Sequence, residues 1–217
     1  MDKPATAHLL EAGEMGLLGE HHPLVEQLGL AEEMHPLTSA ASCLKMPPVT
    51  DLDTLRRFLR TYQSRILLPL ELPAIHQACL HAAAHRTREL IQLDQQLLAS
   101  VQFLEFANAS RRTGQAQLRK LKPLRDVRIL QRYLSAVELN QAQGWHTVVF
   151  GLTLAVYSVP LRQGLLGYSQ QVLRGFMHMA GKRFPVSAAD IEELMAELNA
   201  PLPVALGSLL LLEQFER

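Results

Sequence analysis

The stretch 144–160, GWHTVVFGLTLAVYSVP, decides the fold class of this 217-residue chain. It begins with a glycine, an aromatic residue and a histidine, and it then continues almost without polar side chains to a proline. Its apolar part, residues 148–160, has 13 residues, whereas a helix that spans a bilayer needs about 20. The stretch is therefore predicted to be a buried helix bounded by Gly144 and Pro160, and we expect no membrane partner.

The same helical pattern continues outside this stretch. In RELIQLDQQLLASVQFLEF, residues 88–106, apolar side chains recur every three or four residues and so share one helix face. No segment alternates apolar and polar β-branched residues between turn signals, and no Asn-Gly or Asp-Gly pair suggests a hairpin. These patterns predict an all-α protein.

Prolines and glycines divide the pattern into about nine or ten helices in one single-domain helical bundle, residues 1–217. We expect boundaries at Pro47-Pro48, Pro69, Pro73, Pro123, Gly144, Pro160, Pro185, Pro201 and Pro203. The expected helices are 23–34, 51–67, 72–85, 87–105, 107–121, 124–142, 146–157, 160–181, 187–198 and 202–215. The segment 36–50 is expected to be a loop or a short helix. The Thr50-Asp51 pair suits a helix start.

Composition limits the function classes. Hydrophobic residues make up 48% of the chain and charged residues 19%, which indicates a globular protein. The net charge is zero, which argues against nucleic acid as a partner. Cys43 and Cys79 provide neither a disulfide framework nor a zinc motif. The early residues lack the long apolar run of a signal peptide, so we expect a cytoplasmic protein with reduced thiols.

A cluster of basic residues lies in SRRTGQAQLRKLKPLRDVR, residues 110–128. It has two interpretations, a solvated helix face or a surface that binds phosphate or an acidic protein. No aromatic residue is interleaved, so base stacking is not indicated. The cluster consists of Arg111, Arg112, Arg119, Lys120, Lys122, Arg125 and Arg128.

Nine histidines raise the question of a metal site. His81 and His85 are four residues apart on an expected helix, and this spacing places two imidazoles on one face. Neither they nor the His21-His22 pair have carboxylate or cysteine companions that would complete a set of ligands. We therefore expect no metal cofactor, with His81 and His85 as weak candidates.

Catalytic motifs are also lacking. The sequence has no G-x-S-x-G, no H-E-x-x-H and no phosphate-binding G-x-x-x-x-G-K-[ST] loop. His146 could act as a base, but no neighbour in the sequence orients it. Gly164 and Gly167 are expected to permit close helix packing. The chain is therefore not expected to be an enzyme.

Six short stretches, taken in order, resemble the urease accessory protein F (UreF) family. A Leu-Pro helix start is similar to Leu72-Pro73, and the family's Leu-Asp-x-x-Leu-x-Ala-Ser element resembles LDQQLLAS at residues 93–100. WHTVVFG at 145–151 echoes the family's His-x-Pro-Val-Val-Phe-Gly, with Thr147 where the family usually has proline. The other matching residues are Glu105, Ala109, Ser110, Gly114, Leu118, Arg119, Leu121, the turn YSVP, Tyr168, Ala180, Lys182 and Pro185.

The two ends differ from the family pattern. The region of the family's glycine-rich N-terminal motif reads EHHPLVEQLGLAEEMHPLTSAASC here, and its Pro-Leu-Gly-Gln turn has become PVSA. The family's C-terminal Arg-His-Glu…Ser-Arg-Leu-Phe tail has become ALGSLLLLEQFER, in which only Phe215 matches. Residues 1–50 and 186–217 are therefore divergent.

The resemblance implies a non-catalytic helical scaffold that helps to load nickel into urease. Its implied partners are a UreD/UreH-type accessory protein, the GTPase UreG and the urease apoprotein, and it implies a homodimer. The residues that we expect to bind partners are His146, which is either a capping or a partner-facing residue, with Tyr168, Lys182, Arg111, Arg112, Arg119 and Phe215. The alternative is a divergent helical protein that binds nickel through its histidines and has a different partner.

Overall fold

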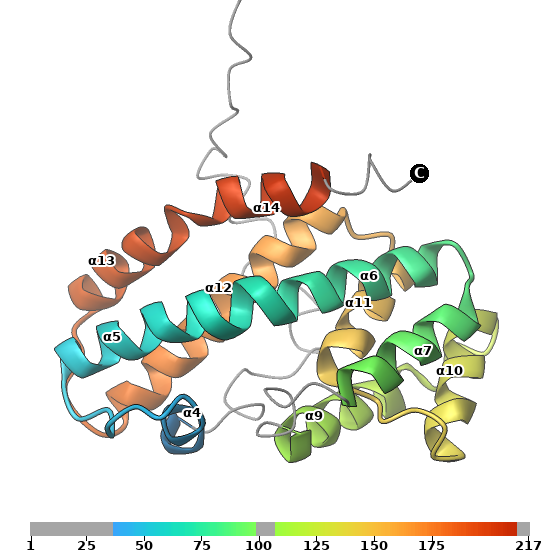
Figure 1. Cartoon of the computed structure of the whole chain (residues 1–217), viewed down its shortest axis with the longest axis horizontal. Coiled ribbons are helices and arrows are strands. Elements are labelled where there is room, and N and C mark those ends of the chain that lie inside the picture. The colour runs from blue at the N-terminus through green and yellow to red at the C-terminus, as the bar shows by residue number, and fades with distance from the viewer. Residues whose placement is uncertain (1–36, 99–106, 212–217) are drawn as a thin grey trace, which may run out of the picture.

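A computed structural model of the chain describes residues 37–98 and 107–211 (Figure 1). All regular structure in these two ranges is helical, which confirms the predicted all-α fold class. The helices form one body, and two of them, α6 and α11, lie at its centre.

A long continuous helix crosses the molecule (Figure 1). It consists of α5 (Leu52–Tyr62), a π-helical segment η2 (Gln63–Glu71) and α6 (Leu72–Ala83). The predicted boundary at Pro69 is therefore wrong. Pro69 lies on the exposed side of η2, and the wider π-helical turn, which pairs each N–H with the carbonyl five residues earlier, tolerates it. The Leu72 N–H, for example, bonds to the Leu67 carbonyl.

The remaining helices follow the prediction with shifted ends. The predicted helix 23–34 lies outside the described residues, and the short helix expected within 36–50 is α4. The helix expected over 124–142 covers only Arg128–Glu138. These helices are α4 (Leu37–Cys43), α7 (Thr87–Leu98), α9 (Ala107–Leu121), α10 (Arg128–Glu138), α11 (His146–Val156), α12 (Leu161–Gly181), α13 (Ala188–Asn199) and α14 (Leu202–Leu211).

The apolar core has two parts that meet at α6 and α11. The larger part lies among α4, α5, α12, α13 and α14, and the smaller part lies among α7, α9 and α10. α11 contributes to both, with Phe150 and Leu154 in the larger part and Val148, Val149 and Leu152 in the smaller part. Nine of its 11 residues are buried. The stretch that decides the fold class is thus the central buried helix, as predicted.

Glycines bring the backbones at this centre into close contact. A Cβ on Gly151 would lie 2.4 Å from the Ile75 carbonyl oxygen, so α11 packs directly on the backbone of α6. A Cβ on Gly114 would lie 2.1 Å from the Gly144 carbonyl oxygen and 2.6 Å from the His146 nitrogen. Gly164 packs against Leu154, in agreement with the prediction for that residue. α9 and α12 thereby approach α11 closely from two sides.

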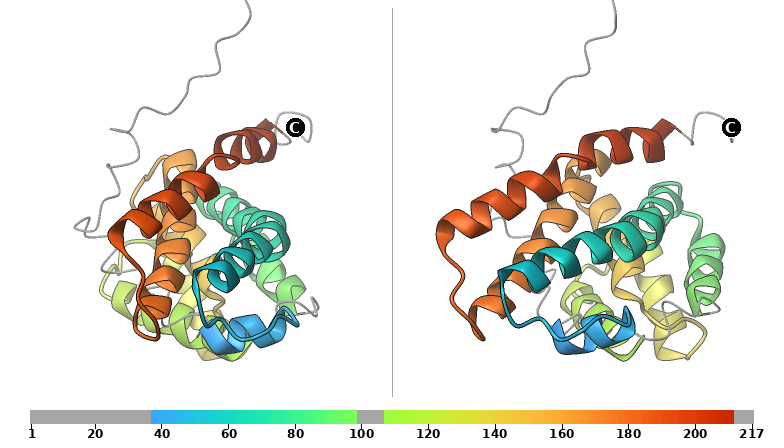
Figure 2. Two further views of the ribbon diagram at one scale, coloured as in Figure 1. Left: turned by 90° about the vertical axis from the view of Figure 1, so that its left-hand side faces the viewer. Right: turned by 60° about the vertical axis from the view of Figure 1, so that its left-hand side comes forward.

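Capping fixes the starts of two outer helices. Asp51 accepts the Thr54 N–H and begins α5, as the Thr50-Asp51 pair predicted, and Ser187 accepts the Asp190 N–H and begins α13. Ser187 belongs to the PVSA segment, so the divergent turn functions here as a helix cap. Arg56 and Arg60 of α5 then form ion pairs with Glu197 of α13. Figure 2 shows α13 and α14 on the side of the molecule opposite α4.

α13 and α14 together form a long apolar stretch of the described chain. The stretch Ala188–Leu211 is long and apolar enough to cross a membrane by length and composition, and 28% of its most apolar window is buried. A turn at Ala200 and Pro201 divides it into helices of 12 and 10 residues. Each is shorter than the ~20 residues of a spanning helix, so this stretch is weak evidence for a membrane segment.

Candidate functional site

His146 is the first residue of α11, and its side chain is buried between α9 and α12. Its Nδ1 lies 2.7 Å from Ser110 Oγ of α9, and its Nε2 lies 2.7 Å from Tyr168 Oη of α12. The imidazole is 2% exposed. It does not cap its own helix, since the Ser110 hydroxyl accepts the His146 backbone N–H instead. His146 therefore connects three helices and has no open side for a substrate.

A buried carboxylate completes this cluster. Glu71 Oε1, at the end of η2, accepts a hydrogen bond of 2.8 Å from the Tyr62 hydroxyl and lies 3.7 Å from His146 Nε2. Tyr62 and Glu71 are nine residues apart, which in an α-helix of 3.6 residues per turn would place them on opposite faces. The wider turn of η2 brings them onto the same face. We call Tyr62, Glu71, Ser110, His146 and Tyr168 the His146 network.

The ionisation states of the two tyrosines in the His146 network suit a structural role. Burial raises the pKa of Tyr62 well above its ordinary value, and the neighbouring Glu71 carboxylate raises it further. Burial also raises the pKa of Tyr168, again with help from the charge of Glu71 and a hydrogen bond to it. Both hydroxyls therefore keep their protons at neutral pH and act as donors. The network holds η2, α9, α11 and α12 in fixed relative positions.

A second buried carboxylate fixes the loop that precedes α11. Asp94 of α7 accepts a hydrogen bond of 2.6 Å from the Tyr133 hydroxyl and further bonds from the N–H groups of Gln143, Gly144 and Trp145. Its own carbonyl accepts the Trp145 Nε1–H at 2.8 Å. Burial raises the pKa of Asp94, while the hydrogen-bond donors oppose that rise. This Asp94 network places an anion beside the positive end of α11.

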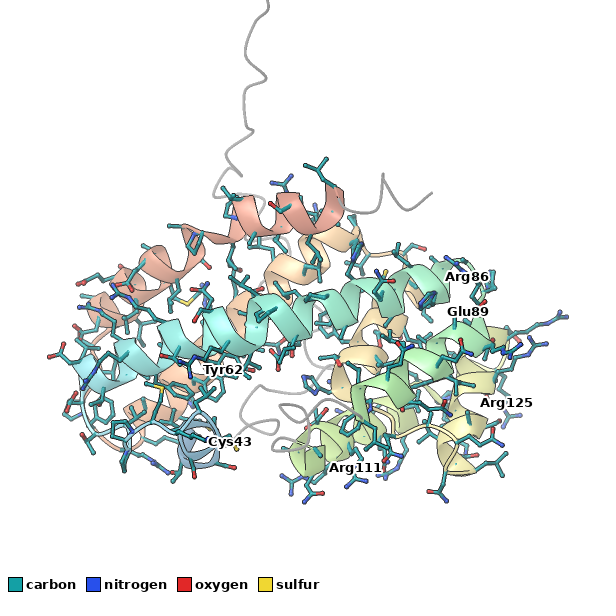
Figure 3. The ribbon with its side chains drawn as sticks, viewed as in Figure 1. Cys43, Tyr62, Arg86, Glu89, Arg111 and Arg125 are labelled. Atoms are coloured by element: carbon teal, nitrogen blue, oxygen red, sulfur yellow. The ribbon has the colours of Figure 1, made fainter. Side chains whose placement is uncertain are left out.

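The predicted basic residues form an exposed surface on α9, α10 and the turn between them. Arg111 is half-buried and donates to Gln143 Oε1 at 3.1 Å and to Asn108 Oδ1 at 2.8 Å. It therefore also fixes the loop before α11, and Figure 3 labels it on α9. We call the exposed members, together with Arg132 of α10, which was not in the predicted cluster, the basic surface: Arg112, Arg119, Lys120, Lys122, Arg125, Arg128 and Arg132.

The remaining predicted residues lie apart from the His146 network. Lys182 is exposed at the end of α12, and Phe215 lies outside the described residues. α6 ends at Ala83, so His85 is not on the same helix as His81, and it has a left-handed backbone with φ of 54°. The expected helical spacing of the two imidazoles is therefore not present. Within residues 37–98 and 107–211 no group of three potential metal ligands occurs.

Sequence reasoning missed three members of the network. No role was predicted for Tyr62, and Ser110 was included only among the residues that match the family. Glu71 was not considered, although a single glutamate inside the apolar run ILLPLELPAI is an unusual residue to bury without a partner. That isolated charge was the signal that pointed to a buried polar partner.

The fold and these networks define a helical protein whose buried polar groups serve its internal structure. The sequence profile of the UreF family matches residues 49–199, so the chain belongs to the UreF family. UreF proteins are non-catalytic accessory proteins of urease, and membership implies partners within the urease accessory complex in general. Comparison with curated proteins gives no match.

Proposed function

We propose that this protein is a scaffold that bridges a UreD/UreH-type accessory protein and the GTPase UreG and thereby regulates nickel delivery to apo-urease. The observation that carries the proposal is the family match over residues 49–199. The buried polar groups bond to one another inside the fold, and this agrees with the proposal because a scaffold acts through its surface. Nickel is the cargo of the complex, and the scaffold itself needs no metal or cofactor.

The partner-binding surface that we propose centres on α9. Arg112 and Arg119 are exposed and seven residues apart, which places them on the same side of this helix. Arg111 lies beside them and is anchored to the loop before α11. Guanidinium groups bind carboxylates with two parallel hydrogen bonds, so an acidic protein surface is the complementary partner.

His146 and Tyr168 contribute to this surface as positioning residues. Both are 2% exposed, and a direct contact with a partner would require the helices to separate. His146 binds Ser110, which directly precedes Arg111 on α9. The network thereby sets the position of α9 and of the arginines on it. Lys182 and Phe215 are proposed as further partner contacts.

The assembly follows the family as well. We propose that residues 1–217 act as one UreF-like domain, that the protein works as a homodimer, and that it acts in the cytoplasm without nucleic acid or a membrane as partner. The divergent residues 1–50 and 186–217 are where its contacts with partners depart most from those of other family members.

The test is co-purification of the tagged protein with the UreD/UreH-type protein and UreG encoded by the same organism. We expect a complex with both, and we expect the double variant Arg112→Glu/Arg119→Glu to retain less than a tenth of one partner. Arg162→Glu is the matched control, because Arg162 is also exposed but lies at the start of α12. Failure of the wild-type protein to bind either partner would refute the scaffold role.

A further inference from the structure

The charges of this protein are segregated although its net charge is zero. Residues 107–138, which contain α9 and α10, have eight Arg and Lys against two Asp and Glu, a net charge of +6. Residues 1–36 have one lysine against seven Asp and Glu, a net charge of −6. The remaining described residues, 37–98 and 139–211, are nearly balanced, with 11 basic and nine acidic residues.

The basic surface is poorly neutralised by its own surroundings. Among the described residues it makes one ion pair, in which Lys122 Nζ lies 3.1 Å from Glu138 Oε1 and both side chains are more than half exposed. An exposed pair of this kind contributes little. Figure 3 shows Arg111 and Arg125 along the lower and right-hand edges of the molecule, where these helices lie.

The positions of some arginines also weaken the helix that carries them. Arg128 is the first residue of α10, where the positive end of the helix dipole disfavours a cation. Arg132 follows four residues later on the same face, and like charges at this spacing repel. Both arginines are exposed, so packing in the described structure does not account for them. An anionic ligand would convert this repulsion into attraction.

We infer that the acidic segment, residues 1–36 of this same chain, docks on the basic surface of α9 and α10. The two charges are equal and opposite, and chain length does not limit the contact. The described structure begins with α4, which lies at the same lower end of the molecule as α9 (Figures 1 and 2). Thirty-six extended residues would span up to about 120 Å, whereas a folded chain of this size has a radius of gyration of about 17 Å.

Docking within one chain needs little intrinsic affinity. A tethered segment is present at an effective concentration on the order of millimolar, so weak charge pairing is sufficient to populate the docked state. The pairing is screened by salt, because the Debye length falls from about 10 Å at 0.1 M to about 3 Å at 1 M. The docked segment covers the surface that we propose for an acidic partner. It therefore acts as an internal competitor, a consequence that rests on the proposed function.

Carbodiimide cross-linking of the full chain tests the docking without any partner protein, because this reagent joins carboxylates directly to lysine amines. We expect cross-links from carboxylates of residues 1–36 to Lys120 or Lys122, at least five times more abundant than those to Lys182. The Lys122–Glu138 cross-link is the internal control for reactivity. The docking cross-links should fall at least fivefold in 0.5 M NaCl.

A variant with six neutralised glutamates provides the matched control for the charges. It should lose the docking cross-links while its circular dichroism and the Lys122–Glu138 cross-link stay unchanged. Isotope-labelled and unlabelled protein are mixed before the reaction, so that links between two copies carry mixed labels. Mixed-label links alone, or equal yields at Lys182, would overturn docking within one chain. The substitutions are Glu11→Gln, Glu14→Gln, Glu20→Gln, Glu26→Gln, Glu32→Gln and Glu33→Gln.

Competition is measured with a fluorescent 12-residue polyglutamate peptide. At 50 mM salt and pH 7.5 the six-glutamine variant should bind this peptide about tenfold more tightly than the wild type, because the basic surface is uncovered. Adding Arg119→Glu, Arg128→Glu and Arg132→Glu to that variant should abolish the gain. Equal affinity of the wild type and the six-glutamine variant would overturn the inference. If the cross-links form and co-purification with urease accessory proteins fails, the proposed function alone is refuted.

Discussion

Asp94 and Glu71 are both buried carboxylates, yet their partners are of different kinds. Asp94 accepts three backbone N–H groups and one tyrosine hydroxyl. Glu71 interacts with side chains, namely the Tyr62 hydroxyl, the His146 imidazole and Tyr168. Backbone donors cannot turn away when their acceptor is lost, whereas hydroxyl groups rotate. The Asp94 network therefore fixes the chain path, and the Glu71 side chain fixes how helices pack.

The largest effect should come from Asp94→Ala. It leaves the N–H groups of Gln143, Gly144 and Trp145 and the Tyr133 hydroxyl without their acceptor in the interior. We expect a loss of about 3–5 kcal/mol of unfolding free energy, measured by urea denaturation.

Asp94→Asn is the graded control for that measurement. Its amide keeps one acceptor oxygen but turns an NH₂ group toward donors, so it should cost about half as much. A cost below 1 kcal/mol for Asp94→Ala would show that water replaces the carboxylate, and it would contradict the structural role.

Gly114→Ala tests the place where α9 touches the loop between the two networks. The added Cβ would lie 2.1 Å from the Gly144 carbonyl oxygen and 2.7 Å from the Trp145 carbonyl carbon. Backbone cannot give way as a side chain can, so we expect a loss of about 3 kcal/mol, at the upper end of overpacking costs. Thermal unfolding measures the effect.

Gly207→Ala is the matched control for that substitution. Gly207 lies within α14, and a Cβ there would have no atom within 4 Å. Since alanine is the better helix former, this variant should be about 0.5–1 kcal/mol more stable than the wild type. Equal effects of the two variants would contradict the close approach at Gly114.

Glu71→Gln should have a smaller effect than Asp94→Asn. The amide keeps the shape of the side chain, and the Tyr62 and Tyr168 hydroxyls can reorient toward the amide oxygen. The charge beside His146 is lost, and hydrogen bonds to a neutral group are weaker than those to a carboxylate. We expect a loss of about 1–2 kcal/mol in urea denaturation. A larger loss than for Asp94→Asn would reverse the comparison between the two carboxylates.

The sequence predicted the features that depend on local residue patterns, namely the fold class and the buried helix α11. Its helical periodicity gave the fold class, and the length and apolarity of residues 144–160 identified α11 as a buried helix. The UreF resemblance drew attention to Asp94, Ser110, His146 and Tyr168, and the family match supports it. None of these signals reveals what each side chain contacts. The expectation that His146 caps a helix or faces a partner, for example, does not include its buried contacts with Ser110 and Tyr168.

The parts that escaped prediction depend on tertiary contacts. A proline such as Pro69 normally indicates the end of a helix. Here the helix continues through Pro69 as the wider π-helical segment η2. The same widening brings Tyr62 onto the face of Glu71, so the local irregularity and the buried cluster have one cause. In the same way, α6 ends before His85, so His81 and His85 do not share a helix face as their four-residue spacing predicts.

The smallest expected effect is the pH dependence that Asp94 contributes. Burial raises its folded pKa above the ordinary value of 3.8, so the folded protein keeps a proton that the unfolded chain has already lost. The resulting stability is fully present below pH 3.8 and is lost as the pH rises through the folded pKa. Asp94→Asn has no such proton. The difference in unfolding free energy between wild type and Asp94→Asn should therefore shrink as the pH rises from 3.8.

Urea denaturation of both proteins between pH 3.5 and 7 measures this difference, because the other carboxylates are common to both and cancel. We expect this difference to decrease as the pH rises, because burial raises the folded pKa of Asp94. A difference that grows with pH would mean that the N–H donors outweigh burial and hold the carboxylate in its charged form. Folding would then favour the charged form of Asp94, which accepts the N–H groups of the loop before α11.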